Sequence, residues 1–180
     1  EYGADAVGFI FVASRRWTTI ETVQSIIAEL PPSVRKVGVF VDEDVLKIKE
    51  TMAFCGLDFA QLHGNESPDD CDVLFPEVIK SFTRDNLPAE AELEQYRACS
   101  FLFDREKGDS TSPEELWETA GKFARQHRMI LAGGLNHLNI VRAIETVCPY
   151  AVDVASGVES KPGKKDLKIM RDFISKAKEV

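Results

Sequence analysis

Short apolar segments alternate with longer amphipathic segments along the whole chain. The apolar segments are continuous runs, as expected for strands of a parallel sheet that is covered by helices. They predict strands at Ala6–Val12, Lys36–Val41, Phe59–Leu62, Val78–Phe82, Ser100–Phe103, Met129–Ala132 and Ala151–Val154. Strands that alternate with helices predict right-handed βαβ units and an α/β fold.

The segments between these strands repeat apolar residues at helical spacing. Three predicted helices have clear apolar faces: Asp44–Gly56 (Val45, Ile48, Met52, Cys55), Asn139–Val147 (Ile140, Val141, Ile144, Val147) and Asp166–Lys178 (Leu167, Met170, Ile174, Ala177). Two further helix starts are marked by Ser67-Pro68 and Ser112-Pro113, each a capping serine before a proline, with acidic residues in the first turn.

Seven predicted strands are one fewer than a closed (β/α)8 barrel needs, and an opened barrel exposes two strand edges. The pattern therefore leaves two architectures, an open doubly wound sheet or a barrel whose leading βα element precedes this sequence. Glu1-Tyr2-Gly3 resembles the end of a helix before the first predicted strand. The length of 180 residues, 44% of them hydrophobic, suits one domain but is short for a barrel of about 250 residues.

Charge and composition narrow the function classes. A net charge of −8 argues against nonspecific binding of nucleic acid or anionic membranes, which requires basic patches. No apolar run of about 18 residues and no signal peptide are present, so we expect a cytoplasmic protein. Cys55, Cys71, Cys99 and Cys148 are far apart and form no CxxC pair. We expect them to be reduced, buried thiols, with neither a metal nor disulfides.

Two neighbouring strands end in small residues, Gly133-Gly134 and Ser156-Gly157. Small residues let backbone N–H groups approach a ligand closely, and one helix-length segment joins the two ends. This pairing is typical of the phosphate site after the last strands of a (β/α)8 barrel, and it indicates a phosphorylated small-molecule substrate. The segment Lys161–Lys165 either adds positive charge near that phosphate or is a solvated loop.

Four charged or polar side chains follow other strands, where a parallel fold gathers its site residues. Asp104 is either a general acid, because a carboxylate beside apolar surface holds its proton more readily, or a cap of the next turn. Arg16 can bind a carboxylate with two hydrogen bonds or be a solvated arginine. His63 and Asp153 each fit a structural hydrogen-bonding role or a ligand contact.

The motifs GADAVGFIF, SRRW, KVGVFV, QLHG, FLFD, LAGGLN and VDVASGVES-KPGKKD together resemble, in order and over essentially the whole chain, the phosphoribosylanthranilate isomerases of tryptophan biosynthesis. The resemblance implies a (β/α)8 barrel of one domain over residues 1–180. It also implies a cofactor-free Amadori rearrangement of N-(5-phosphoribosyl)anthranilate to 1-(2-carboxyphenylamino)-1-deoxyribulose 5-phosphate.

By matching motif positions, the resemblance makes Asp104 the general acid and Arg16 the residue that holds the anthranilate carboxylate. The resemblance implies further substrate contacts at Gln61, His63 and Asp153. It implies that the phosphate site is formed by Gly133, Gly134, Ser156 and Gly157. The resemblance also implies a protein without nucleic-acid or membrane partners, as a monomer or homodimer.

Three departures from the family pattern concern the chain start and two loops. The family's first strand carries the cysteine base, and none of the four cysteines here takes its place. The loop before Ser14 is short, and the polar segment Arg105–Thr111 lacks a glycine-rich substrate-binding stretch. We expect a longer natural enzyme, with a preceding strand and part of a helix before Glu1 and additional residues near Ala13/Ser14 and Gly108/Asp109.

Two alternatives remain beside an active isomerase. One is a truncated barrel that binds phosphate but has lost catalysis. The other is a different phosphosugar barrel enzyme, such as the bifunctional isomerase of histidine and tryptophan synthesis or a ribulose-phosphate epimerase. The epimerase requires metal-ligand histidines, and only His63 follows a predicted strand.

Overall fold

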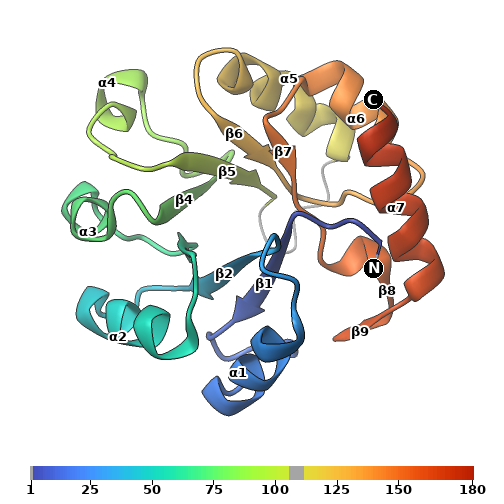
Figure 1. Cartoon of the computed structure of the whole chain (residues 1–180). Coiled ribbons are helices and arrows are strands. Elements are labelled where there is room, and N and C mark those ends of the chain that lie inside the picture. Colours follow the sequence, from blue (N-terminus) through green and yellow to red (C-terminus); the bar gives the residue numbers. More distant parts are fainter. Residues whose placement is uncertain (1, 106–111) are drawn as a thin grey trace. The chain divides into compact units, whose positions relative to one another are not determined.

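The computed structural model describes residues 2–105 and 112–180. The chain divides into two compact units (Figure 1). The N-terminal unit comprises Ala4–Ser81 and Pro88–Cys99. The C-terminal unit comprises Glu1–Gly3, Phe82–Leu87 and Ser100–Val180. Each unit is built from parallel strands that follow one another in chain order, with helices between them.

The N-terminal unit contains the first three strands of the chain and the fourth as far as Ser81. They are β1 (Ala6–Ile10), β2 (Arg35–Phe40), β3 (Phe59–Leu62) and β4 (Val78–Thr83), and each pairs in parallel with the next. The helices are α1 (Ile20–Glu29), α2 (Val45–Cys55), α3 (Pro68–Leu74) and the short α4 (Glu90–Leu93).

The core of this unit lies between the strands and α1 to α3, which cover one face of them (Figure 1). Alternate strand residues point into it, including Ala60, Leu62 and Val78, and all three are fully buried. Because side chains alternate along a strand, the residues between them, such as Gln61, face the other side. Fully buried Val23 of α1 and Ile48 of α2 complete the packing.

The C-terminal unit contains β5 (Ser100–Asp104), β6 (Met129–Leu131) and β7 (Ala151–Val152), also parallel. Its helices are α5 (Pro113–Ala124), α6 (Ile140–Val147) and α7 (Leu167–Glu179). After β7 the chain forms a 3-10 turn, η1 (Ser156–Val158), and an antiparallel hairpin of β8 (Glu159–Lys161) and β9 (Lys164–Lys165). Figure 1 shows this turn and hairpin close to α7, which contacts η1.

The predicted strands and helices are present, with ends that differ by one or two residues. The caps are confirmed: the hydroxyls of Ser67 and Ser112 accept hydrogen bonds from the N–H groups of Asp70 and Glu115. Gly56 ends α2 with a φ of +70°, a left-handed conformation that glycine adopts without strain.

Three predictions for these segments were wrong. The helix end predicted at Glu1–Gly3 is not among them, because Glu1 lies outside the described residues and the φ of +87° at Gly3 is one that glycine commonly adopts after a helix. Leu167 of α7 is 60% exposed, and the buried residue of that helix is Phe173. Cys148, which ends α6 in a left-handed conformation, is exposed, and Cys99 is half-buried; Cys55 and Cys71 are buried as expected. All four thiols are free. The segment Lys161–Lys165 belongs largely to the β8–β9 hairpin and is not an irregular loop.

The expected additional residues near Gly108/Asp109, and residues 106–111 of the predicted polar loop, lie outside the described residues. Within the described parts of the chain, no helix has the length and apolar character needed to cross a membrane.

Candidate active site

The three strands of the C-terminal unit end at the same level. Phe103 of β5 pairs with Leu131 of β6, which pairs with Val152 of β7. The ladder continues one step further, because the N–H of Ala132 donates to Phe103 O at 2.8 Å and the N–H of Asp153 donates to Leu131 O at 2.8 Å. The register therefore aligns the residues after these pairs, and Asp104 and Asp153 lie at one edge of the sheet, as the sequence predicted.

Asp104 is half-buried at the end of β5, and its carboxylate accepts a hydrogen bond from the N–H of Arg105 at 2.7 Å. This contact agrees with the predicted cap of the following turn. Gly133 packs directly against this turn. A Cβ on Gly133 would lie 2.8 Å from Arg105 N and 3.2 Å from Asp104 Oδ1. The glycine thus allows the β6 loop to approach the Asp104 carboxylate.

The loop from Gly133 to α6 is organised by two asparagine side chains around the carbonyl of Gly134. Asn136 and Asn139 donate their amide N–H groups to Gly134 O at 3.3 and 3.1 Å. The side-chain oxygen of Asn139 also accepts from Asn136 N at 2.8 Å. Both glycines have positive φ, +81° for Gly133 and +75° for Gly134. The result is a hydrogen-bonded turn of backbone at the N-terminal end of α6, in which Gly134 is exposed.

The second small-residue strand end forms the 3-10 turn η1, and it touches the first one. A Cβ on Gly157 would lie only 1.8 Å from the carbonyl oxygen of Leu135. Glycine is therefore required here by the close approach of the two turns. Ser156 is exposed beside this contact. The structure thus brings Gly133, Gly134, Ser156 and Gly157 together, as expected for a single phosphate site.

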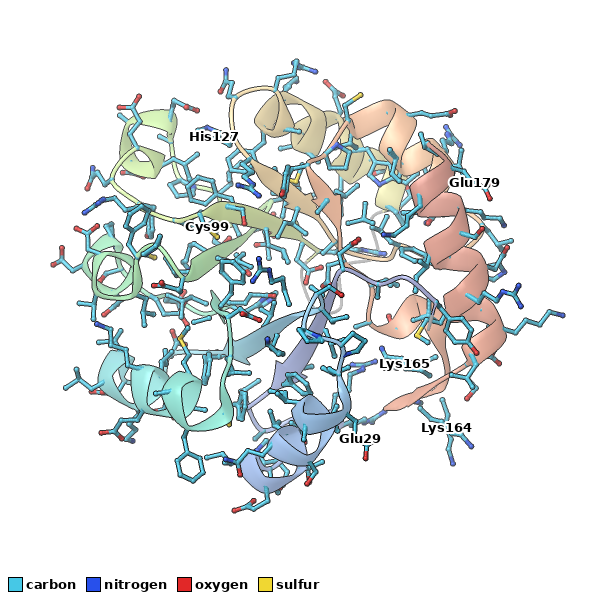
Figure 2. All side chains as sticks on the ribbon, viewed as in Figure 1. Glu29, Cys99, His127, Lys164, Lys165 and Glu179 are labelled. Atoms are coloured by element: carbon cyan, nitrogen blue, oxygen red, sulfur yellow. The ribbon has the colours of Figure 1, made fainter. Side chains whose placement is uncertain are left out.

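Lys165 connects the hairpin to this turn. Its ammonium group donates to Ala155 O at 2.7 Å and contacts Glu159 Oε1 at 3.2 Å. The Glu159 side chain is only 4% exposed, so this ion pair holds the hairpin against the residue that precedes η1. Figure 2 shows Lys164 and Lys165 side by side on the hairpin, with Lys164 extending outward.

The strand ends of the N-terminal unit carry the other predicted contacts. Gln61, 9% exposed, lies on β3, and its Nε2 is 3.2 Å from Nδ1 of His63. The N–H of His63 extends the ladder by donating to Phe40 O at 2.9 Å. The two side chains therefore face the same side of the strand, and the amide and the imidazole together offer several hydrogen-bonding groups to a polar ligand.

Arg16 lies in a tight turn that folds back on the end of β1. Trp17 N donates to Ser14 O at 3.2 Å, and Thr18 N donates to Ile10 O at 3.1 Å. The backbone N–H of Arg16 donates to the Ser14 hydroxyl at 3.1 Å. These bonds fix the backbone of Arg16 beside the strand end, and its side chain is half-buried while Trp17 is 56% exposed.

Sequence reasoning missed a buried ion pair next to the His63 strand end. Lys80 of β4 and Glu66 of the loop after β3 lie 2.8 Å apart, and each side chain is 2% exposed. The sequence does carry one indication of it. Lys80 lies within an apolar strand segment, and a buried charge requires a partner.

Taken separately, the C-terminal unit carries a carboxylate beside two small-residue turns, and the N-terminal unit carries an arginine and an imidazole–amide pair, each at strand ends. Among residues 2–105 and 112–180, no group of three His, Cys, Asp or Glu side chains is placed to hold a metal ion. A carboxylate and an imidazole are groups that can transfer protons, and a guanidinium group can bind a carboxylate.

Comparison with known proteins agrees with this chemistry. Residues 1–176 match the family described as N-(5'phosphoribosyl)anthranilate (PRA) isomerase. A relative named N-(5'-phosphoribosyl)anthranilate isomerase from Pelobacter propionicus is 44% identical over 98% of this chain and 87% of its own length. One from Bacillus cereus is 45% identical over 99% of this chain and 91% of its own length.

Solved structures show the same likeness. Phosphoribosyl anthranilate isomerase from Thermotoga maritima superposes with a TM-score of 0.86 at 36% identity, covering 99% of this chain and 90% of the other. A second phosphoribosyl anthranilate isomerase, in complex with reduced 1-(o-carboxyphenylamino)-1-deoxyribulose 5-phosphate, gives a TM-score of 0.82 at 36% identity with the same coverage. These proteins are (β/α)8 barrels, which confirms the predicted fold class and excludes the open doubly wound sheet.

Proposed function

Because this chain belongs to the N-(5'-phosphoribosyl)anthranilate isomerase family of tryptophan biosynthesis, we propose that its described residues supply the acid and the substrate contacts of that isomerisation. The substrate is N-(5-phosphoribosyl)anthranilate. The observation that carries the proposal is the contact of the Asp104–Arg105 turn with Gly133, which joins a carboxylate to the phosphate-binding turns.

The phosphate binds at the two small-residue turns, which Gly133, Gly134, Ser156 and Gly157 form. Backbone N–H groups and the Ser156 hydroxyl donate to its oxygens, and the N-terminal end of α6 favours its negative charge. The global charge of −8 opposes an anionic ligand, so these local dipoles must provide the attraction.

Asp104 acts as the general acid. It transfers its proton to the ribose ring oxygen while the C1–O bond breaks and the anilino nitrogen forms a Schiff base with C1. Loss of the C2 proton to a base then gives an enamine, whose tautomerisation yields the ketone product. The family resemblance assigns that base to a cysteine on the family's first strand, which none of the four cysteines of this sequence replaces. No cofactor is consumed, because the reaction moves hydrogen within one molecule.

Arg16, Gln61, His63 and Asp153 contact the remainder of the substrate. The guanidinium group of Arg16 pairs with the anthranilate carboxylate, since its planar fork matches two carboxylate oxygens. Gln61 and His63 act together through their 3.2 Å contact. We place the enzyme in the cytoplasm, as a single barrel domain over residues 1–180. We expect it to be a monomer or a homodimer; the relative from Thermotoga maritima is named as a dimeric enzyme of which monomers were generated.

The test is the Asp104→Asn variant, assayed by the loss of substrate fluorescence and by binding of the reduced product analogue. We expect turnover to fall about 10²- to 10⁴-fold, the usual contribution of general acid catalysis, while the analogue still binds. Asp85→Asn is the matched control, because Asp85 is an exposed aspartate paired only with its neighbour Arg84 in the contacts described. Wild-type turnover in Asp104→Asn would refute the assigned role, and loss of analogue binding would point to a structural role.

A further inference from the structure

The buried Glu66–Lys80 pair has no part in the proposed chemistry, yet two charges are held out of water. Their side chains are 2% exposed and 2.8 Å apart. Burying an ion pair costs free energy that the mutual attraction often fails to recover, and apolar residues of similar size frequently stabilise a protein at least as well. A contribution to stability alone is therefore a weak explanation for the pair.

Both charges are bound to the backbone of one residue, Gly64. Lys80 Nζ donates to Gly64 O at 2.7 Å, and Glu66 accepts the Gly64 N–H at 2.9 Å on Oε2 and 3.1 Å on Oε1. Glu66 Oε1 also accepts the N–H of Asp42, which follows β2, at 2.9 Å. The ion pair is thus hydrogen-bonded to the peptide groups on both sides of Gly64, and Glu66 also links them to the end of β2.

Asp42 packs closely against Gly64. A Cβ on Gly64 would lie 2.4 Å from Asp42 Oδ1 and 2.8 Å from Asp42 N. Asp42 itself adopts a positive φ of 50°, and its carboxylate accepts from Asn65 N at 2.6 Å. The turn after β3 is therefore fixed by hydrogen bonds and close packing from β2 and β4 together.

His63 directly precedes Gly64. Its own N–H is bound to Phe40 O, and its carbonyl belongs to the peptide whose N–H Glu66 accepts. The backbone on both sides of the imidazole is thus set by fixed partners. We propose that Glu66 and Lys80 are positioning residues that hold the His63–Gly64 peptide so that the imidazole meets the substrate; this rests on the substrate contact proposed for His63.

The proposal is tested by a double-mutant cycle on the full chain, with the dissociation constant of the reduced product analogue as the readout. The variants are Glu66→Gln, His63→Ala and both together. We expect Glu66→Gln to weaken binding about 10-fold or more, because a lost hydrogen bond to a charged ligand group typically costs about 10- to 100-fold in affinity. In the His63→Ala background, the same change should alter the dissociation constant less than about two-fold.

Two controls separate positioning from folding. Inorganic phosphate, which is expected to bind through the turns of the C-terminal unit, should bind Glu66→Gln with unchanged affinity. Glu118→Gln removes a charge from the exposed pair with Lys122 on α5 and should change neither affinity. If Glu66→Gln does not fold, Glu66→Gln/Lys80→Gln replaces it in the cycle, since that variant leaves no single charge buried without a partner.

Each outcome decides the matter. Equal losses in both backgrounds, or analogue binding by Glu66→Gln that matches the unmodified protein, would overturn the positioning role and leave the proposed function intact. If His63→Ala binds the analogue normally, the substrate contact of His63 is wrong and the positioning role falls with it. Weakened analogue binding that disappears in the His63→Ala background, with phosphate affinity intact, supports the proposal.

Discussion

Gly157→Ala should separate the two phosphate-binding turns. The added Cβ would lie 1.8 Å from Leu135 O and 2.9 Å from Leu135 C, whereas real Cβ contacts essentially never fall below 3.0 Å. The turns must therefore move apart by about 1.2 Å, and both partners are backbone, which cannot rotate away as a side chain could. Overpacking of this kind costs about 1–3 kcal/mol.

The displacement should appear most clearly in ligand affinity. Because a lost hydrogen bond to a charged group typically costs about 10- to 100-fold in affinity, we expect phosphate and the reduced product analogue to bind up to about 100-fold more weakly, as measured by calorimetry. The free energy of unfolding should fall by about 1–3 kcal/mol in urea.

Gly121→Ala is the matched control for this change. Its Cβ would meet its nearest atom, Thr146 O, at 3.6 Å in the middle of α5, which is ordinary contact. Alanine in a helix interior should raise stability by about 0.4–1 kcal/mol and leave binding unchanged. If Gly157→Ala binds phosphate as tightly as Gly121→Ala does, the two turns do not form one site, and the reasoning fails.

Three further results are expected. Arg16→Ala should weaken binding of the carboxyphenyl analogue about 10- to 100-fold, as for a charge-assisted hydrogen bond, with phosphate affinity unchanged; equal loss of both would contradict a carboxylate contact. Exposed Cys148 should react with iodoacetamide at pH 8 before Cys71, whose thiol pKa burial raises to about 12; peptide mass spectrometry that finds Cys71 alkylated first would refute this. Burial acts to raise the pKa of Asp58, but hydrogen bonds and charge from Lys36 outweigh it and lower that pKa. The stability that Asp58 contributes is therefore present above its ordinary pKa and lost as pH falls through the lowered value. In Asp58→Asn, the free energy of unfolding should fall less steeply as the pH is lowered through this range. An unchanged acid dependence of the free energy of unfolding would contradict the pairing.

Local patterns along the chain were sufficient to locate the strands and helix starts. Phe59–Leu62 was predicted to the residue, because an apolar run is bounded there by polar residues, and Ser67-Pro68 marks a helix start by chemistry that acts within one turn. The small-residue strand ends were equally visible, since Gly133 and Ser156 directly follow apolar runs.

Contacts between distant segments were not readable in the same way. Lys80 and Glu66 are 14 residues apart, and neither helical nor strand spacing relates them, so only the folded chain shows that they pair. The contact between Gly157 and Leu135 is likewise set by the packing of two loops. Helical spacing places Leu167 on the apolar face of α7, but its side chain is 60% exposed.

The closeness of Gly133 to the Asp104–Arg105 turn has a consequence for substrate selection. Gly133 packs against the backbone of that turn, with a would-be Cβ 2.8 Å from Arg105 N, so backbone contact sets the distance between the backbone of Asp104 and the proposed phosphate turn. A fixed spacing of this kind selects substrates by the distance between their phosphate and their ring oxygen. A phosphorylated sugar with one carbon more or fewer between its phosphate and its ring oxygen would be held at the phosphate and still present the wrong atom to the carboxylate.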